Sequence, residues 1–214
     1  MNFNIKNSNL KLLYFNIRGR GELIRMILYA ANKDFEDVRV TENQWPSLKS
    51  QMPFGQLPVL EMTPQGDAGD KITLTESMAI ARLLARELDL YGNTVNEVYL
   101  IERVNSLTSA LQEEIYRLHL KKAEDAERHV KMDHLNEYFE AIEDMLKITT
   151  TKFIAGSNVT MADLQIINLL DTLNKCLGNM QVDCKPRLEK IKTDVLNDRP
   201  SLGKYLRSRP NTDF

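Results

Sequence analysis

One tyrosine, Tyr14, lies at a position where α/β proteins commonly bind ligands. Tyr14 lies near the end of a short apolar run, Lys11–Asn16, that is typical of a buried strand. The turn Arg18–Gly21 follows, and a helical pattern begins at Glu22. Because α/β sheets bind ligands at the carboxyl ends of parallel strands, the Tyr14 hydroxyl is a candidate functional group. By position alone, Tyr14 also fits a tyrosine that only fills the core.

Residues that could bind a metal or form a redox pair are scattered along the chain. His119, His129 and His134 have no second histidine at the three- or four-residue spacing of a helical metal site. Cys176 and Cys184 are eight residues apart and form no C-x-x-C motif, so thioredoxin-type redox chemistry is not expected. We therefore expect no metal and two reduced thiols.

The composition excludes several classes of partner. Lys and Arg number 28 against 30 Asp and Glu, a net charge of −2, which argues against a nucleic-acid groove or a polybasic membrane surface. No apolar run reaches the roughly 18 residues of a membrane span, and the first ten residues lack the apolar region of a secretion signal. These features predict a globular protein of the cytoplasm that binds neither membrane nor nucleic acid.

The first 90 residues alternate between strand and helix patterns. Strand patterns at Lys11–Asn16 and Phe35–Val40 flank a helical pattern at Glu22–Ala31, which predicts a parallel βαβ unit. Two further strands, Leu57–Met62 and Lys71–Thr75, are expected to form a hairpin. Between the two pairs, a short irregular helix is expected within residues 41–50, and a periodic helix follows the hairpin at residues 77–88.

From Thr94 onward, every predicted element is helical, so we expect an α/β domain at 8–90 and an all-helical domain at 94–214. The expected helices of the second domain cover residues 94–120, 123–149, 161–174, 186–197 and 200–207. Within this domain, Thr160–Asp163 is predicted to be a capping box, a structural feature and not part of a site.

Several motifs together resemble one enzyme family. The segment Leu13–Glu22 (LYFNIRGRGE) is similar to the opening of a sigma-class glutathione transferase. In matching order, the similarity continues at Glu36–Val40, Gln44–Pro46, Pro53–Leu60, Glu76–Arg82, Gly156–Asp163 and Arg209–Thr212. The resemblance covers essentially the whole chain. It implies a thioredoxin-like domain followed by an all-helical domain, glutathione as co-substrate, and a homodimer.

The resemblance assigns the activation of glutathione to two residues. Tyr14 matches the catalytic tyrosine of the family, whose hydroxyl donates to the glutathione sulfur and favours the nucleophilic thiolate. A free thiol with a pKa of about 8.5 is ionised to only about 3% at pH 7. One neutral hydrogen bond is worth about 1 kcal/mol, less than a shift of about two pKa units requires. Arg20, which matches a family arginine near the sulfur, is expected to add a positive charge.

The binding of glutathione is implied at further matching positions. Trp45 and Lys49, four residues apart on one helical face, are expected to donate to the glycine carboxylate of glutathione. Leu57 and Pro58 match a pair joined by a cis peptide bond, which exposes the Leu57 backbone so that the cysteinyl unit adds like an extra strand. Gln56 is expected to lie alongside.

The γ-glutamyl end of glutathione is expected at the start of a helix, near Glu76 and Ser77, where free N–H groups and a hydroxyl suit a carboxylate. Ser77 is a good N-cap residue type. Relatives usually carry an acidic residue in the first long helix that binds the glutathione amine across the dimer, but Ser106–Ala110 has none. The recognition of the ammonium is therefore expected to depend on Glu76.

The electrophile pocket implied by the resemblance includes Phe15, Arg20, Tyr116 and Phe214. The predicted function is conjugation of the glutathione thiolate to small hydrophobic electrophiles, a detoxification reaction. Two alternatives remain open: a glutathione-dependent prostaglandin D synthase, which uses the same thiolate, and a non-catalytic crystallin-like protein or ligand carrier.

Overall fold

The computed structural model describes residues 4–65, 70–120, 137, 138, 140–147, 149–176 and 185–212. Its contacts divide the chain into two compact units. The first unit comprises Met1–Tyr91 together with Arg199–Phe214, and the second is Gly92–Asp198. From the sequence, all of 94–214 was expected in the second domain. The structure groups the last residues with the first unit because helix α8 (Pro200–Ser208) packs against helix α1 (Glu22–Ala30).

A four-stranded sheet forms the centre of the first unit. Its strands are β1 (Ser8–Phe15), β2 (Glu36–Val40), β3 (Val59–Pro64) and β4 (Ile72–Leu74), in the order β2-β1-β3-β4. β1 and β2 are parallel, whereas β3 is antiparallel to both β1 and β4. This is the thioredoxin-like arrangement that the sequence predicted, with its βαβ unit and its hairpin.

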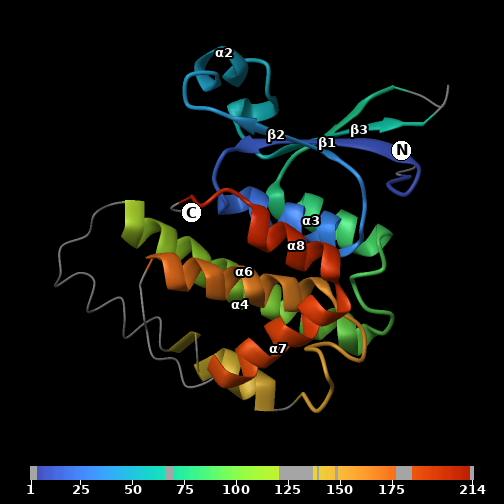
Figure 1. The fold of residues 1–214 in the computed structure, drawn as a ribbon, viewed down its shortest axis with the longest axis vertical. Coiled ribbons are helices and arrows are strands. Elements are labelled where there is room, and N and C mark those ends of the chain that lie inside the picture. Colours follow the sequence, from blue (N-terminus) through green and yellow to red (C-terminus); the bar gives the residue numbers. More distant parts are fainter. Residues whose placement is uncertain are drawn as a thin grey trace. The chain divides into compact units, whose positions relative to one another are not determined.

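Helices cover one face of this sheet. α1 connects β1 to β2 and is buried along almost its whole length, and both α3 (Ser77–Glu87) and α8 contact it. In Figure 1, α3 and α8 lie below the sheet, whereas the short helix α2 (Trp45–Lys49) lies above it. This extensive burial of α1 explains why its sequence has so few polar positions.

The second unit is helical throughout its described elements. α4 (Val95–Leu120) packs against α6 (Met161–Cys176), and α6 packs against α7 (Lys185–Asp198). The helix predicted at 123–149 lies partly outside the described residues, although residues 140–147 are helical. None of the helices that the structure describes combines the length and the apolar character needed to cross a membrane.

Two acidic side chains bind the backbone at the starts of the long helices. At α6, the Asp163 carboxylate accepts from the Thr160 N–H at 2.8 Å, from the Thr160 hydroxyl at 2.9 Å, and from the Ile154 N–H at 2.9 Å. Half of the predicted capping box is therefore present: Asp163 accepts from the Thr160 N–H, whereas the Asp163 N–H bonds to the Thr160 backbone carbonyl and not to its hydroxyl. A second capping box, which the sequence analysis overlooked, joins Thr94 and Glu97 at α4.

The Thr160→Ala variant should be less stable than the wild type at neutral pH. Burial raises the pKa of Asp163 from 3.8 to about 6, so the folded protein binds this proton more readily than the unfolded chain does. The contribution of Asp163 to stability is complete below pH 3.8 and is lost as the pH rises through 6. The Thr160 hydroxyl limits this loss because it donates to the charged carboxylate.

We expect the Thr160→Ala substitution to lower the free energy of unfolding by about 0.5–2 kcal/mol at pH 7.5. A smaller loss is expected at pH 5, where Asp163 is mostly protonated. Urea unfolding at both pH values measures this difference. An equal loss at the two values would show that the carboxyl group does not titrate between them.

Candidate active site

Tyr14 lies at the end of β1 with 6% of its surface exposed, and its hydroxyl oxygen accepts a hydrogen bond from the Arg20 backbone N–H at 3.0 Å. The intervening 3-10 turn, Gly19–Gly21, lies directly on the tyrosine ring. A Cβ on Gly19 would stand 2.6 Å from the Tyr14 hydroxyl oxygen, and one on Gly21 would stand 2.4 Å from ring atom Cδ1. Only glycine fits at either position without movement of the ring.

This role of the glycines was not predicted from the sequence, where Arg18–Gly21 was interpreted only as a turn. The available signal was the pair of glycines on either side of Arg20, directly after the strand that contains Tyr14. The short 3-10 turn brings the Arg20 N–H to the tyrosine hydroxyl.

The Tyr14 hydroxyl is a neutral donor at physiological pH. Burial is the largest influence on its pKa and raises it, whereas the Arg20 N–H and the charges of Arg20 and Arg25 act in the opposite direction. The hydroxyl oxygen accepts the Arg20 N–H, but its own proton has no acceptor among the described residues. A ligand atom beside it can therefore receive that hydrogen bond.

Arg25 is a fully buried cation beneath Tyr14. Its Nε donates to both carboxylate oxygens of Asp37 at 3.0 and 3.1 Å, while its Nη atoms donate to the carbonyls of Ile17 at 2.8 Å and Phe15 at 3.3 Å. The Arg25 Cζ lies 5.6 Å from the centre of the Tyr14 ring. Arg25 was not predicted from the sequence, although a charged residue within an almost wholly apolar helix is a visible signal.

A small hollow at the start of α3 brings together six of the nine residues predicted to bind glutathione. We call it the α3 hollow, and it is lined by Arg20, Pro53, Phe54, Gln56, Leu57, Pro58, Thr75, Glu76 and Ser77. Arg20 connects it to Tyr14, since its backbone N–H binds the tyrosine hydroxyl while the residue lines the hollow. Segments that are far apart in sequence thus meet at one place.

Trp45 and Lys49 lie on α2, outside the lining of the α3 hollow. The Trp45 ring meets the Phe15 ring edge-on, with the centroids 5.3 Å apart. The Lys49 side chain runs along the turn at Gly55, where a Cβ would stand 3.5 Å from its Cγ and Cε atoms. Both side chains are therefore anchored next to segments that carry site residues.

The peptide bond between Leu57 and Pro58 is cis, as the resemblance predicted. Leu57 directly precedes this proline, and β3 begins at Val59. The Leu57 backbone N–H and C=O have no hydrogen-bond partner among the described residues. They are available to a peptide-like ligand lying alongside in an extended conformation.

The start of α3 places backbone N–H groups beside a carboxylate. The helix begins at Ser77, and the N-cap is Glu76, which makes no side-chain capping bond. The prediction of Ser77 as the cap residue was wrong by one position, because the Ile80 N–H bonds to the Glu76 carbonyl at 2.9 Å. Glu76 has a φ of 68°, a strained conformation for a non-glycine residue that is found preferentially at functional sites.

The remaining predicted side chains are distributed over both units. Of the expected electrophile pocket, Phe15 and Arg20 belong to the first unit, Tyr116 lies on α4 in the second, and Phe214 lies outside the described residues. His129, His134 and Cys184 also lie outside them. Within the described part of the chain, no cluster of three His, Cys, Asp or Glu residues could hold a metal ion.

Comparison with known proteins gives a consistent result for both units. Residues 10–86 match the family model of the glutathione S-transferase N-terminal domain, and residues 109–209 match that of the C-terminal domain. A curated relative, the glutathione S-transferase class-mu 28 kDa isozyme of Schistosoma japonicum, is 36% identical over 208 residues, covering 95% of this chain and 100% of the relative. The solved structure of a sigma class GST from Fasciola hepatica superposes with a TM-score of 0.86 at 32% identity, covering 97% of this chain and 100% of that one.

The Gly21→Ala substitution should disturb Tyr14 through steric overlap alone, since the φ of Gly21 is −83° and suits alanine. We expect the free energy of unfolding to fall by about 1–3 kcal/mol, together with a changed near-ultraviolet dichroism of the tyrosines. Gly55→Ala is the matched control. The added Cβ would make only an ordinary contact with Lys49 at 3.5 Å. Any loss of stability in this variant comes from the backbone conformation, which has a φ of 59°. A near-ultraviolet spectrum unchanged in Gly21→Ala would contradict the packing of the turn on the ring.

Proposed function

The chain belongs to the glutathione S-transferase family, and from this premise we propose that Tyr14 activates the thiol of glutathione bound at the α3 hollow. The protein is a glutathione transferase, an enzyme that joins the sulfur of glutathione to electrophiles. The observation that supports Tyr14 is its buried hydroxyl, which accepts the Arg20 N–H and retains its own proton for donation.

The Tyr14 hydroxyl lowers the pKa of the glutathione thiol by stabilising the thiolate. A hydrogen bond to a charged acceptor contributes about 1.5–3 kcal/mol, which corresponds to roughly one to two pKa units. The Arg20 N–H polarises the hydroxyl and makes it a better donor. The positive charges of Arg20 and Arg25 add attraction for the thiolate, so a free thiol pKa of about 8.5 falls to near neutrality.

The ends of glutathione are bound by groups of matching charge. The γ-glutamyl carboxylate accepts from the first N–H groups of α3 and from Ser77, where the helix dipole favours an anion. The Leu57 backbone pairs with the cysteinyl unit, and Gln56 lies beside it. Trp45 and Lys49 donate to the glycine carboxylate.

We further propose that the protein is of the sigma class and acts as a homodimer in the cytoplasm. The segment Leu13–Glu22 and the likeness to the Fasciola hepatica sigma class structure support the class. Large apolar side chains that are exposed in a single copy of the chain suit a contact between two copies. The largest exposed fractions are 84% for Phe54, 85% for Val95 and 63% for Tyr99. Phe15 and Arg20 are proposed to contact the electrophile.

The Tyr14→Phe variant should lose about tenfold or more in turnover with an aryl halide, because the only donor to the thiolate from this side chain is removed. The pKa of the bound thiol, read from thiolate absorbance in the ultraviolet, should rise in parallel. Tyr29→Phe removes a hydroxyl that has no partner among the described residues and should change neither value. Equal thiol pKa values in Tyr14→Phe and the wild type would assign activation to another group.

The Glu76→Gln variant should bind glutathione about 1–3 kcal/mol more weakly, the range for a hydrogen bond to a charged group. Glu76 is the only carboxylate that lines the α3 hollow, so the glutathione ammonium has no other counter-charge there. Titration calorimetry measures the change, with Glu42→Gln, an exposed glutamate outside the hollow, as the control. Normal binding by Glu76→Gln and weak binding by Glu113→Gln or Glu114→Gln would move the ammonium contact to α4.

A further inference from the structure

A carboxylate is buried at the first residue of α1. Glu22 is 1% exposed, and its Oε2 accepts a hydrogen bond from the Tyr205 hydroxyl at 2.9 Å. Its Oε1 accepts from Nη1 of Arg209, and Nη1 of Arg25 lies 3.6 Å from its Oε2. Two of its partners thus come from residues that follow it by 183 and 187 positions in the chain.

Such a carboxylate is costly unless it is paired. Removing an ion from water costs several kcal/mol, and the cost is offset only where the geometry is good and the lone pairs are satisfied. The Tyr205 hydroxyl and the Arg209 guanidinium occupy both oxygens of Glu22. They leave Arg25 at 3.6 Å, longer than its bonds of 2.8 and 3.0 Å to the Ile17 carbonyl and Asp37.

The pairing of Glu22 is linked to Tyr14 along two short routes. Glu22 directly follows Gly21, the residue whose backbone lies against the Tyr14 ring. Arg25, three residues on, donates to the Phe15 and Ile17 carbonyls at the end of β1. Both the turn that covers Tyr14 and the strand that carries it therefore depend on the charges at the start of α1.

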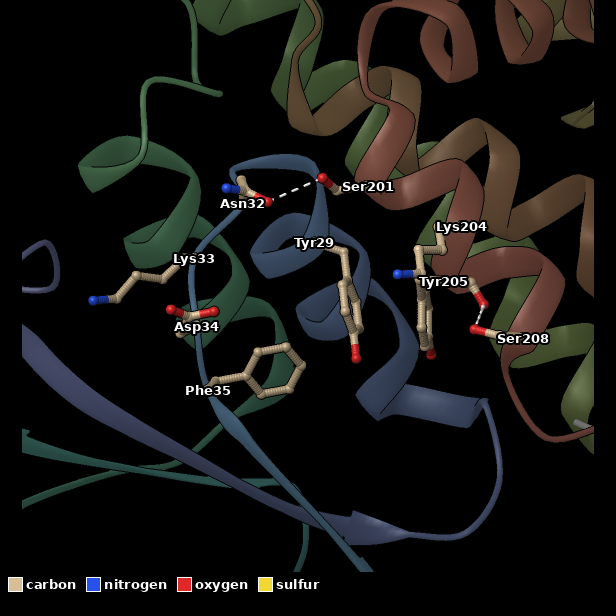
Figure 2. A pocket seen from close by; sticks show the side chains of 9 residues that line it. All are labelled: Tyr29, Asn32, Lys33, Asp34, Phe35, Ser201, Lys204, Tyr205 and Ser208. Carbon is tan, nitrogen blue, oxygen red and sulfur yellow. Dashed lines mark hydrogen bonds between the residues drawn. The ribbon is translucent and has the colours of Figure 1, made fainter.

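The ring of Tyr205 is fixed independently of its hydroxyl. It stacks on the Tyr29 ring of α1, with the centroids 4.1 Å apart and the planes at 12°, and Figure 2 shows the two rings side by side with both hydroxyls pointing the same way. Nearby, the Ser201 hydroxyl donates to Asn32 at 3.0 Å. Removal of the Tyr205 hydroxyl should therefore leave α8 in place and change only the environment of Glu22.

We infer that Tyr205 and Arg209, near the end of the chain, are positioning residues for the activation of glutathione. By donating to Glu22, they prevent this carboxylate from drawing Arg25 away from the Phe15 and Ile17 carbonyls. Arg25 then stays beneath the Tyr14 ring, and Tyr14 stays bound to the Arg20 N–H. The inference rests on the proposed role of Tyr14. It adds that Tyr205 and Arg209 keep the Tyr14 side chain in position for that role.

The Tyr205→Phe variant tests the inference. We expect a higher pKa of the bound glutathione thiol and a roughly three- to tenfold lower kcat, the factor that corresponds to one hydrogen bond, with the KM for glutathione little changed. Tyr29→Phe is the matched control, because it removes a hydroxyl from the other ring of the same stacked pair. The Tyr29 hydroxyl has no partner among the described residues, so this variant should retain the wild-type thiol pKa.

A second pair of variants examines the charge at Arg209. Arg209→Met should raise the thiol pKa as Tyr205→Phe does, and Arg209→Lys should restore part of the shift because it keeps a cation near Glu22. A wild-type thiol pKa in both Tyr205→Phe and Arg209→Met would overturn the inference. So would an equal shift in Tyr29→Phe.

The Tyr14→Phe variant separates this inference from the proposed function. If Tyr14→Phe raises the thiol pKa while Tyr205→Phe and Arg209→Met do not, the inference alone fails. If Tyr14→Phe leaves the thiol pKa unchanged, the proposed role of Tyr14 fails, and with it the inference.

Discussion

The buried guanidinium of Arg25 connects the three elements that must meet for the site to form. α1 carries it, the end of β1 accepts hydrogen bonds from it through two carbonyls, and Asp37 of β2 binds its Nε. A buried cation requires such partners, since an unpaired one would cost several kcal/mol. The geometry at the end of β1, and with it the place of Tyr14, follows from satisfying this charge.

The turn between β1 and α1 depends on a steric condition as well. Gly19 and Gly21 lack the Cβ atoms that would overlap with Tyr14, so the turn can lie flat on the ring and present the Arg20 N–H to the hydroxyl. Burial keeps the Tyr14 hydroxyl protonated, and the N–H makes it a stronger donor. These surroundings suit the Tyr14 hydroxyl to donate a hydrogen bond to a thiolate.

The α3 hollow combines donors for anions with one carboxylate. The backbone N–H and C=O of Leu57 have no partner among the described residues, and the α3 helix begins beside them, which suits a ligand that is itself a peptide with charged ends. The strained φ of Glu76 fits the same interpretation, because such a conformation persists where the surroundings enforce it. The chemistry of glutathione, with two carboxylates, one ammonium and one thiol, matches these groups.

The sequence alone predicted the helices and strands, which depend on residues close to one another in the chain. The helix expected at 77–88 is observed as Ser77–Glu87, and the strand expected at Lys11–Asn16 is observed as Ser8–Phe15, because hydrophobic periodicity and turn residues act over a few positions. Six of the residues that the family motifs assigned to glutathione binding line the α3 hollow. Local patterns do not determine boundaries to the residue, so the cap of α3 was placed one position too late.

Only the tertiary structure determined which residues, distant in the sequence, bind each buried charged side chain. Nothing in the pattern around Glu22 indicates that its partners are Tyr205 and Arg209, 183 and 187 positions away. The same holds for Arg25, whose partners come from two different strands, and for α8, which packs with the first unit although it follows the helical one. Such pairings arise when folding removes charges from water, and each charge then binds whichever opposite charges and hydrogen-bonding groups the fold brings near.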